Sequence, residues 1–251
     1  MLRSFRPAIS GFAAVLLFGM NGCGQGTAPS DHHTSGGHVF PKADRAISPG
    51  LTTGFPSEVE RESFNEAKVV MDLADIKPGM TVADIGAGAG YYTVRLSERV
   101  GAKGRVLAED IDRDTIRKLG LRVERERLEN VSIKLGSPED PNLPKDSFDR
   151  IFLVHMYHEV EEPYAFLWNL RPSLRPGGRV IVVDVDRSSD AHGIPPELLF
   201  CEFGALGFRL SEFVRKPELQ GYYAQFEANG GRPGPEAIVP CRLSGSSGKE
   251  K

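Results

Sequence analysis

The sequence has few cysteines, no excess of positive charge and no long apolar run, and each of these absences narrows the possibilities. The formal net charge is −3 over 251 residues. This leaves no basic field for a nucleic acid, so we expect no nucleic-acid partner. The apolar run over 9–20 is short and interrupted by glycine, which is too little for a membrane span. The hydrophobic content of 40% suffices for one sizeable domain core.

The three cysteines are Cys23, Cys201 and Cys241. If Cys23 were lipidated, the other two could pair in an oxidising compartment. Because Cys201 falls in a predicted helix, we expect a buried free thiol there instead. The sequence also predicts no metal site, since His32, His33 and His38 match no closed ligand spacing.

The first 23 residues are typical of an export signal. Two positive charges in Met1–Arg6 precede the apolar run, and Gly22-Cys23 follows it. A cysteine after a small residue indicates a bacterial lipoprotein. We therefore expect an exported protein, anchored through a lipidated Cys23 and facing the periplasm or the cell exterior. A signal peptide with another fate stays open, as does initiation at Met20, which would give a cytoplasmic protein.

Composition divides the remainder of the chain into three parts. Residues 24–50 are rich in Gly, Ser, Thr, Pro and His without hydrophobic periodicity, so they are predicted to form a flexible tether. A single domain is predicted over 51–230, and residues 231–251 are expected to be a disordered tail.

The most informative segment joins a strand to a helix through alternating glycines. The spacing predicts a strand over 81–85 and a helix over 91–100, separated by Gly86, Gly88 and Gly90. The N–H groups that begin this helix point into the loop, as at a nucleotide site.

Two common nucleotide loops are excluded by spacing. A dinucleotide loop would place its third glycine at Tyr91, and a P-loop would continue with Gly-Lys-Ser or Gly-Lys-Thr. A carboxylate before the glycines favours a ligand with a cationic end. S-adenosylmethionine (SAM) carries an ammonium and a sulfonium but no phosphate. We expect Asp84 to counter that charge and Asp110, at the end of the next strand, to bind a ribose diol.

In these features the chain resembles the class I SAM-dependent methyltransferases, in the broad group of methyltransferase-domain proteins. The resemblance covers roughly residues 55–228. Four motifs carry it in the order typical of the family: Lys77-Pro-Gly-Met-Thr-Val-Ala-Asp-Ile-Gly-Ala-Gly-Ala-Gly-Tyr-Tyr-Thr93, Gly104-Arg-Val-Leu-Ala-Glu-Asp-Ile-Asp112, Asp146-Ser-Phe-Asp-Arg-Ile-Phe-Leu-Val154 and Leu174-Arg-Pro-Gly-Gly-Arg-Val-Ile-Val-Val-Asp184.

The alternation of strands and helices predicts an α/β fold with helices on both faces of a mostly parallel sheet. The resemblance adds a Rossmann-like, doubly wound sheet that ends in an antiparallel hairpin. The expected strands are 81–85, 105–110, 131–135, 149–154, 179–185, 209–214 and 222–227. The expected helices are 60–75, 91–100, 113–127, 162–173 and 195–206.

The resemblance also implies a set of SAM-binding residues near the carboxyl ends of the strands. They are Asp84, Gly86, Ala87, Gly88, Gly90, Tyr92, Asp110, Ser137, Pro138 and His155. Ser137 departs from the family, which often has an aspartate there for the adenine amino group. Glu139 could substitute for it, or the segment 136–144 could be only a proline-rich loop. Tyr91, Tyr92 and Phe64 could close over the cofactor or lie in the core.

The segment His155-Met-Tyr-His-Glu159 concentrates titratable groups where the resemblance places the substrate. We expect His155 to contact the cofactor and Tyr157 or His158 to face the methyl acceptor. A helix-capping role for His158 or Glu159 stays open. The segment 55–64 and the helix over 195–206, with residues 192–197 before it, are expected to shape the acceptor pocket.

The predicted activity is SAM-dependent methyl transfer, by in-line displacement, to a small-molecule or protein acceptor. Two alternatives remain: a protein-L-isoaspartate-type carboxyl methyltransferase, and a non-catalytic SAM- or nucleoside-binding protein of the same fold. An exported enzyme would lack an evident supply of SAM, which keeps the second alternative open.

Overall fold

The computed structural model describes residues 32–47 and 57–242. The predicted signal segment with Met20 and Cys23, the stretch 48–56 and the last residues from 243 lie outside this part of the chain. In the part that is described, no helix combines the length and the apolar character that crossing a membrane requires.

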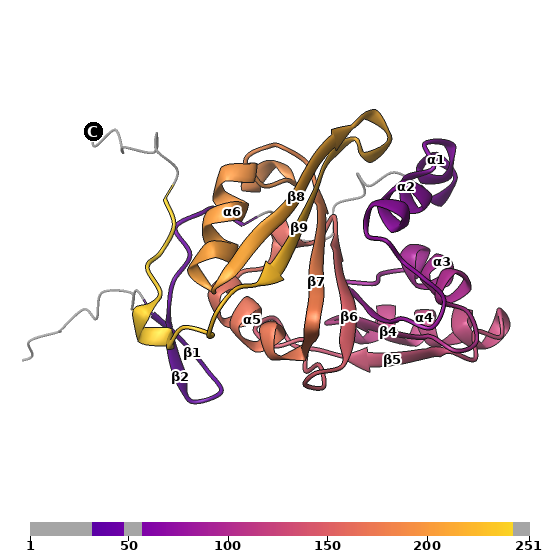
Figure 1. The fold of residues 1–251 in the computed structure, drawn as a ribbon, viewed down its shortest axis with the longest axis horizontal. Helices are drawn as coiled ribbons and strands as arrows, with labels where there is room; N and C mark the ends of the chain where they lie inside the picture. The colour runs from indigo at the N-terminus through magenta and orange to yellow at the C-terminus, as the bar shows by residue number, and fades with distance from the viewer. Residues whose placement is uncertain (1–31, 48–56, 243–251) are drawn as a thin grey trace, which may run out of the picture. The chain divides into compact units, whose positions relative to one another are not determined.

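The sheet has seven strands in the order β5-β4-β3-β6-β7-β9-β8 (Figure 1). Strands β3 to β7 pair in parallel, and β9 is antiparallel to both of its neighbours, β7 and β8. This is the predicted α/β architecture with a C-terminal antiparallel hairpin. The strands of this sheet are β3 (Thr81–Ile85), β4 (Arg105–Asp110), β5 (Val131–Leu135), β6 (Phe148–Val154), β7 (Leu174–Asp184), β8 (Phe208–Lys216) and β9 (Gly221–Ala228).

Six α-helices accompany the sheet in the described residues. They are α1 (Glu58–Ser63), α2 (Glu66–Leu73), α3 (Tyr91–Val100), α4 (Arg113–Arg125), α5 (Pro163–Leu170) and α6 (Pro196–Ala205). Short 3-10 turns follow β6 as η1 (Tyr157–Glu159) and β7 as η3 (Ser189–Ala191). The predicted helix over 60–75 is instead two helices, because Asn65 adopts a left-handed φ of 56° between them.

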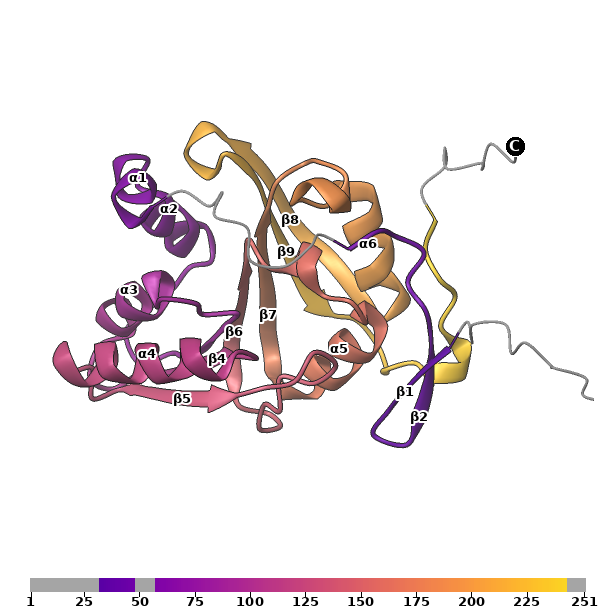
Figure 2. The ribbon, with the colours of Figure 1, turned by 180° about the vertical axis from the view of Figure 1, so that it is seen from behind.

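Alternate strand residues enter two apolar clusters on opposite faces of the sheet. Val82 and Phe152 pack with α2 and α3, whereas Ala83 and Ile151 pack with α5 and α6. Burial on both faces explains why the central strands are nearly continuous apolar runs. Figure 2 shows the molecule from behind, with helices α1 to α4 as one group and helices α5 and α6 as the other.

The predicted flexible tether over 24–50 is wrong for the residues that the structure describes. Strands β1 (His32–Ser35) and β2 (His38–Pro41) form an antiparallel hairpin. Phe40 is buried in the main core, with its ring 5.6 Å from that of Trp168. Apolar burial of Phe40 therefore fixes a segment whose polar composition suggested disorder.

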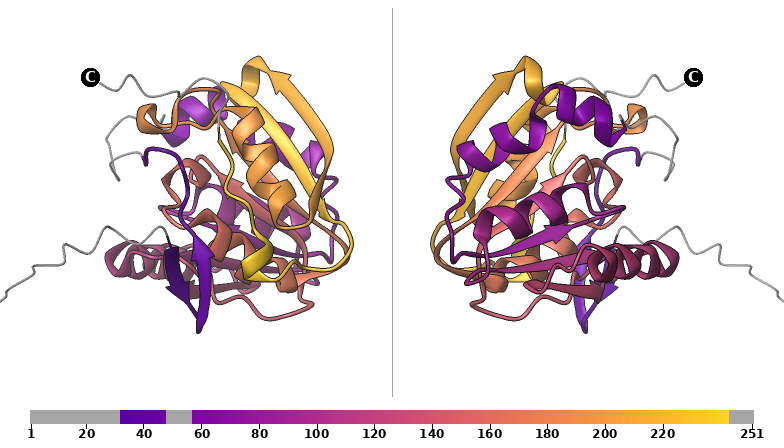
Figure 3. Two further views of the ribbon diagram at one scale, coloured as in Figure 1. Left: turned by 90° about the vertical axis from the view of Figure 1, so that its left-hand side faces the viewer. Right: turned by 90° about the vertical axis from the view of Figure 1, so that its right-hand side faces the viewer.

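The predicted disordered tail is likewise ordered as far as residue 242. It contains the 3-10 turn η5 (Pro235–Ala237), which contacts β2 (Figure 3). Cys241 is buried and forms a disulfide with Cys201. The prediction of a buried free thiol at Cys201 is wrong on both points, since Cys201 is exposed on α6 and bonded to the returning tail.

Candidate active site at the carboxyl ends of the strands

The glycine loop after β3 is attached to the end of β4. The amide of Gly88 donates to Asp110 Oδ2 at 3.0 Å, and the amide of Ala87 donates to the carbonyl oxygen of Glu109 at 2.9 Å. The other oxygen of Asp110 accepts from the amide of Asp112 at 2.9 Å. The two predicted halves of the cofactor site, the glycines and the distal acid, are thus adjacent.

Gly90 is the position in this loop that most clearly requires glycine. Its φ is +87°, and a Cβ at this position would lie 2.5 Å from Leu119 Cδ1 of α4. The left-handed backbone therefore favours glycine, and any side chain here would also require Leu119 to shift. Gly86 is covered by Met156, whose Cγ would lie 3.0 Å from a Cβ there. The loop is thus confined between α4 and the segment after β6.

Asp84, near the end of β3, precedes the glycine loop and is 3% exposed. Its Oδ2 accepts a hydrogen bond of 2.6 Å from the hydroxyl of Thr93. Burial raises the pKa of Asp84 to about 6, and the Thr93 hydrogen bond offsets this only in part. A cation near the loop would favour the ionised form, as the predicted role of Asp84 requires.

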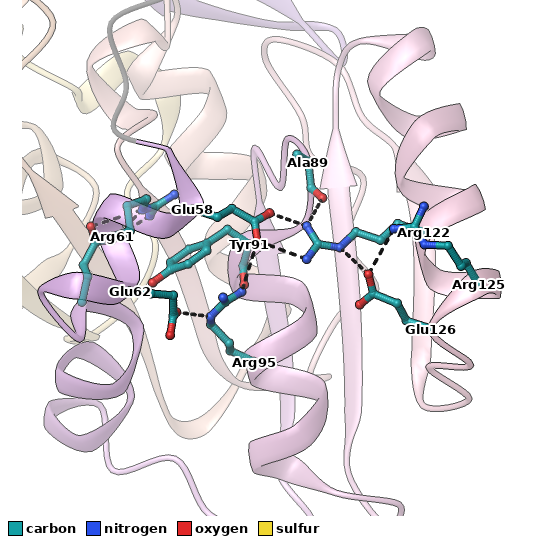
Figure 4. A network of polar contacts seen from close by, with 10 residues as sticks. Glu58, Arg61, Glu62, Ala89, Tyr91, Arg95, Arg122, Arg125 and Glu126 are labelled. Carbon is teal, nitrogen blue, oxygen red and sulfur yellow. Dashed lines mark hydrogen bonds and ion pairs between the residues drawn. The ribbon is translucent and has the colours of Figure 1, made fainter.

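Helices α1 and α4 meet across the glycine loop (Figure 4). Arg122 of α4 donates to both carboxylate oxygens of Glu58 on α1, and also to the carbonyl oxygen of Ala89 at 2.8 Å. A second bridge joins Arg95 to Glu62 at 2.5 Å. The N-terminal helices are therefore held over the loop by charge-assisted hydrogen bonds.

Glu66 of α2 joins the leading helices to the predicted site residues. It accepts from the hydroxyl of Tyr92 at 2.9 Å and from Arg61 at 2.6 Å, and its Oε2 lies 3.6 Å from His155 Nε2. Burial alone would raise the pKa of Glu66, but His155 and Arg61 outweigh it and lower the pKa to about 2. His155, predicted to contact the cofactor, is thus held by a carboxylate that the sequence did not reveal.

The three aromatic residues considered as a lid have different positions. Tyr91 and Tyr92 are buried, and the Tyr91 ring lies between the guanidinium groups of Arg61 and Arg95, at 4.1 and 3.8 Å. Phe64 is 42% exposed. The two tyrosines therefore pack as core residues, and Phe64 alone is free of the core.

The segment after β5 carries the departure from the family pattern. Ser137 pairs with Asp140 through the backbone, and its hydroxyl donates to the carbonyl oxygen of Asp140 at 3.2 Å. Beside it lies the buried carboxyl of Glu109, whose Oε1 has no hydrogen-bond partner among the described residues. A Cβ at Gly136 would meet that oxygen at 1.7 Å. Burial, followed by the charge of Asp110, raises the pKa of Glu109 to about 8.

Turn η1 carries the other two predicted catalytic residues, and they have different surroundings. Tyr157 is fully buried, and its hydroxyl donates to Glu202 Oε2 of α6 at 2.8 Å. His158 is 1% exposed, and its Nδ1 lies 3.0 Å from both carboxylate oxygens of Asp184 at the end of β7. Asp184 also accepts from the amide of Val185. The pairing orients the His158 ring so that Nε2 is its second functional atom.

Arg45, in the segment predicted as a tether, supports turn η1 through its side chain. It forms a buried ion pair of 3.0 Å with Glu202. It also donates to the carbonyl oxygens of Tyr157, His158 and Val160 at 3.3, 3.1 and 2.8 Å. The backbone of η1 is therefore fixed by a side chain more than a hundred residues earlier in the chain.

A family model described as a methyltransferase domain matches residues 76–202, just over half of the chain. The chain belongs to this methyltransferase family. Its cofactor is SAM, and the site fits that group: the acidic side chains of Asp84, Glu109 and Asp110 surround the loop, and an unpartnered carboxylate oxygen lies beside Gly136. Cationic groups and hydrogen-bond donors of a ligand suit such surroundings.

Two curated relatives are similar in sequence to part of this chain. A protein-L-isoaspartate O-methyltransferase of Methanothrix thermoacetophila is 31% identical over 45% of this chain and 51% of that protein. The ubiquinone/menaquinone biosynthesis C-methyltransferase UbiE of Methylococcus capsulatus is 31% identical over 59% of this chain and 58% of that protein. The chain therefore spans about half the length of the curated relatives it matches.

The fold agrees with a solved structure. The crystal structure of a SAM dependent methyltransferase from Aquifex aeolicus superposes with a TM-score of 0.59 at 22% identity, covering 68% of this chain and 97% of that chain. At this identity the likeness shows a common fold only. The methyl acceptor has to be argued from the residues of the site.

Proposed function

We propose that this methyltransferase transfers the methyl group of SAM to an acceptor bound beside turn η1. The hydrogen bond from Gly88 to Asp110 carries the proposal, because it brings the glycine loop and the distal acid together at the carboxyl edge of the sheet. SAM supplies an electrophilic methyl group when bound. The residues of this chain then hold the acceptor in line and exclude water, which accounts for much of the acceleration in such displacements.

Among the predicted catalytic residues, His158 has the surroundings best suited to the acceptor. When Nδ1 donates to Asp184, Nε2 carries the lone pair that can take a proton or bind a cation. We infer that His155 contributes to the cofactor side through Glu66, and that Tyr157 acts through the position it gives to η1.

Transfer of a radiolabelled methyl group tests this function. The purified chain is incubated with labelled SAM and separate pools of small thiols, phenols, lipids and proteins. We expect label in one class of acceptor, and at least a tenfold lower rate in Asp110→Ala. Binding of SAM without transfer to any pool would favour the non-catalytic alternative.

A protein-facing carboxyl methyltransferase is the second candidate, favoured by the 31% identity to the isoaspartate enzyme. The Tyr157-His158-Glu159 segment supports a small-molecule acceptor instead. A peptide with one isoaspartyl residue and its aspartyl twin separate the two, since the carboxyl enzyme would label only the first.

We also propose that the domain acts outside the cytoplasm. The Cys201–Cys241 disulfide supports this location, because such bonds persist in oxidising compartments. Cell fractionation, with mass analysis of the N-terminal peptide, tests it. An acylated Cys23 in the membrane fraction is expected, and a cytoplasmic protein beginning at Met20 would overturn the proposal.

A further inference from the structure

Two histidines and a glutamate meet at the carboxyl ends of β6 and β7, outside the glycine loop. They are His158 and Glu159 of η1 and His192, which follows η3. One ligand atom from each residue lies within 4.8 Å of the other two. Among the described residues, no other group of three or more such side chains comes this close. We propose that they form a binding site for a divalent transition-metal ion.

The separations suit a shared ion. His158 Nε2 lies 3.9 Å from Glu159 Oε1. Two ligands that each lie about 2.1 Å from a Zn²⁺ ion are roughly 3.4 Å apart in tetrahedral geometry. Closing the triangle therefore needs only small side-chain movements. Two imidazoles and one carboxylate are a donor set suited to Zn²⁺ or Fe²⁺, and they leave a coordination position open.

The surroundings of His158 already match those of a metal ligand. Its Nδ1 is held by the fully buried carboxylate of Asp184, at 3.0 Å from both oxygens. In metal-binding histidines the second ring N–H commonly donates a hydrogen bond to a carboxylate in this way, which directs the other nitrogen to the ion.

The loop that carries His192 is also fixed. His192 adopts a left-handed φ of 55°, and a hydrogen bond of 2.9 Å from Ile194 N to Val185 O closes the loop. The hydroxyl of Tyr222 donates to the carbonyl oxygen of Ile194 at 2.9 Å. The ring of His192 stands nearly perpendicular to that of His158, with centroids 5.9 Å apart. The three ligands are thus largely arranged before an ion arrives.

The role of this ion rests on the proposed function. Strands β6 and β7 end at the same edge of the sheet as β3, so an acceptor oxygen in the open position would lie on the cofactor side. A Zn²⁺ ion in an enzyme site can lower the pKa of a coordinated water to about 7. An acceptor hydroxyl bound there would similarly lose its proton to solvent. Its oxygen would then form a bond to the methyl carbon of SAM as the bond from that carbon to the sulfonium sulfur breaks, which releases S-adenosylhomocysteine. The metal would then do the work otherwise assigned to His158 as a base.

Titration of the chelator-treated full chain with Zn²⁺, followed by calorimetry, tests the site. One equivalent is expected to bind, and His192→Ala and Glu159→Gln are each expected to weaken the affinity at least about 100-fold. The control is the triple variant His32→Ala, His33→Ala, His38→Ala, which removes the histidines of the β1–β2 hairpin and should bind as the unmodified chain does. Unchanged binding in both site variants, or its loss in the triple variant, would overturn the proposal.

Parallel titration with SAM separates this inference from the proposed function. We expect His192→Ala and Glu159→Gln to bind SAM as the unmodified chain does, which also shows that they fold. If the unmodified chain binds SAM but takes up no Zn²⁺ at millimolar concentration, the metal site fails and the methyltransferase proposal stands.

Discussion

At the residue scale, Gly90 fixes where the glycine loop ends and helix α3 begins. Its left-handed backbone ends the loop, and α4 packs against the space where a side chain would be. A substitution at Gly90 should therefore change both the backbone of the loop and the binding of the cofactor.

Gly90→Ala should destabilise the domain by about 2–4 kcal/mol, through left-handed strain and overpacking against Leu119. Chemical denaturation measures the change, and SAM affinity should fall with it. Gly120→Ala on α4 is the matched control. A Cβ at Gly120 would lie 3.8 Å from its nearest neighbour, so we expect this substitution to raise the free energy of unfolding by up to about 1 kcal/mol. Equal effects of the two substitutions would contradict this role for Gly90.

Glu109 gives a pH dependence whose sign follows from its surroundings. Its pKa is raised from 4.5 to about 8 in the folded chain, so between these values the folded state binds more protons than the unfolded state. The free energy of unfolding should therefore fall as the pH rises from about 4.5 to about 8. Asp84, with a pKa of about 6, adds to the same trend at its lower end.

Glu109→Gln should remove the Glu109 part of this slope. Melting temperatures of the variant and the unmodified chain should differ little at pH 5, and the variant should be the more stable at pH 8.5. Thermal denaturation across this range measures the difference. Parallel curves would show that Glu109 does not titrate in this way.

At the scale of elements, the regular strands could be predicted from sequence, and the supports of the site could not. The strands over 81–85, 105–110 and 131–135 and the helix over 91–100 have their predicted bounds, because apolar runs and glycines define them locally. The break at Asn65 has no such signal.

The β1–β2 hairpin shows what composition can hide. Its polar sequence suggested a tether, although Gly36-Gly37, both with positive φ, were a usable turn signal. What orders this segment is contact between distant parts of the chain: Phe40 with the core, and Arg45 with Glu202. Similarly, His192 and Asp184 join His158 only in the fold, so the sequence predicted no metal site there.

Arg45→Ala should destabilise the domain by about 3–5 kcal/mol, because it leaves the carboxylate of Glu202 buried without its cation. The turn η1 should loosen as well, which would appear as faster amide exchange over 157–160. Arg242→Ala, which breaks an exposed pair with Asp44, is the control and should cost under about 1 kcal/mol. A similar small loss in both variants would show that Arg45 does not support the turn.

At the scale of the whole molecule, the disulfide ties the C-terminal segment to α6, next to Glu202. It closes a loop of 40 residues. On the loop-closure model this stabilises the fold by about 4 kcal/mol. The bond thus connects the C-terminal segment to the helix that supports η1.

The double variant Cys201→Ser, Cys241→Ser should therefore unfold at markedly lower denaturant concentration than the oxidised chain. A reducing agent should bring the unmodified chain close to the variant and leave the variant unchanged. If the reductant shifts neither protein, the disulfide does not contribute to stability.

Calorimetric titration of SAM into the purified chain tests the methyltransferase assignment most directly. We predict one site per chain, an affinity at least tenfold weaker in Asp110→Ala, and an unchanged affinity in Asp114→Ala, an exposed residue on α4. The absence of binding at millimolar SAM, or equal affinity in both variants, would contradict the proposed site.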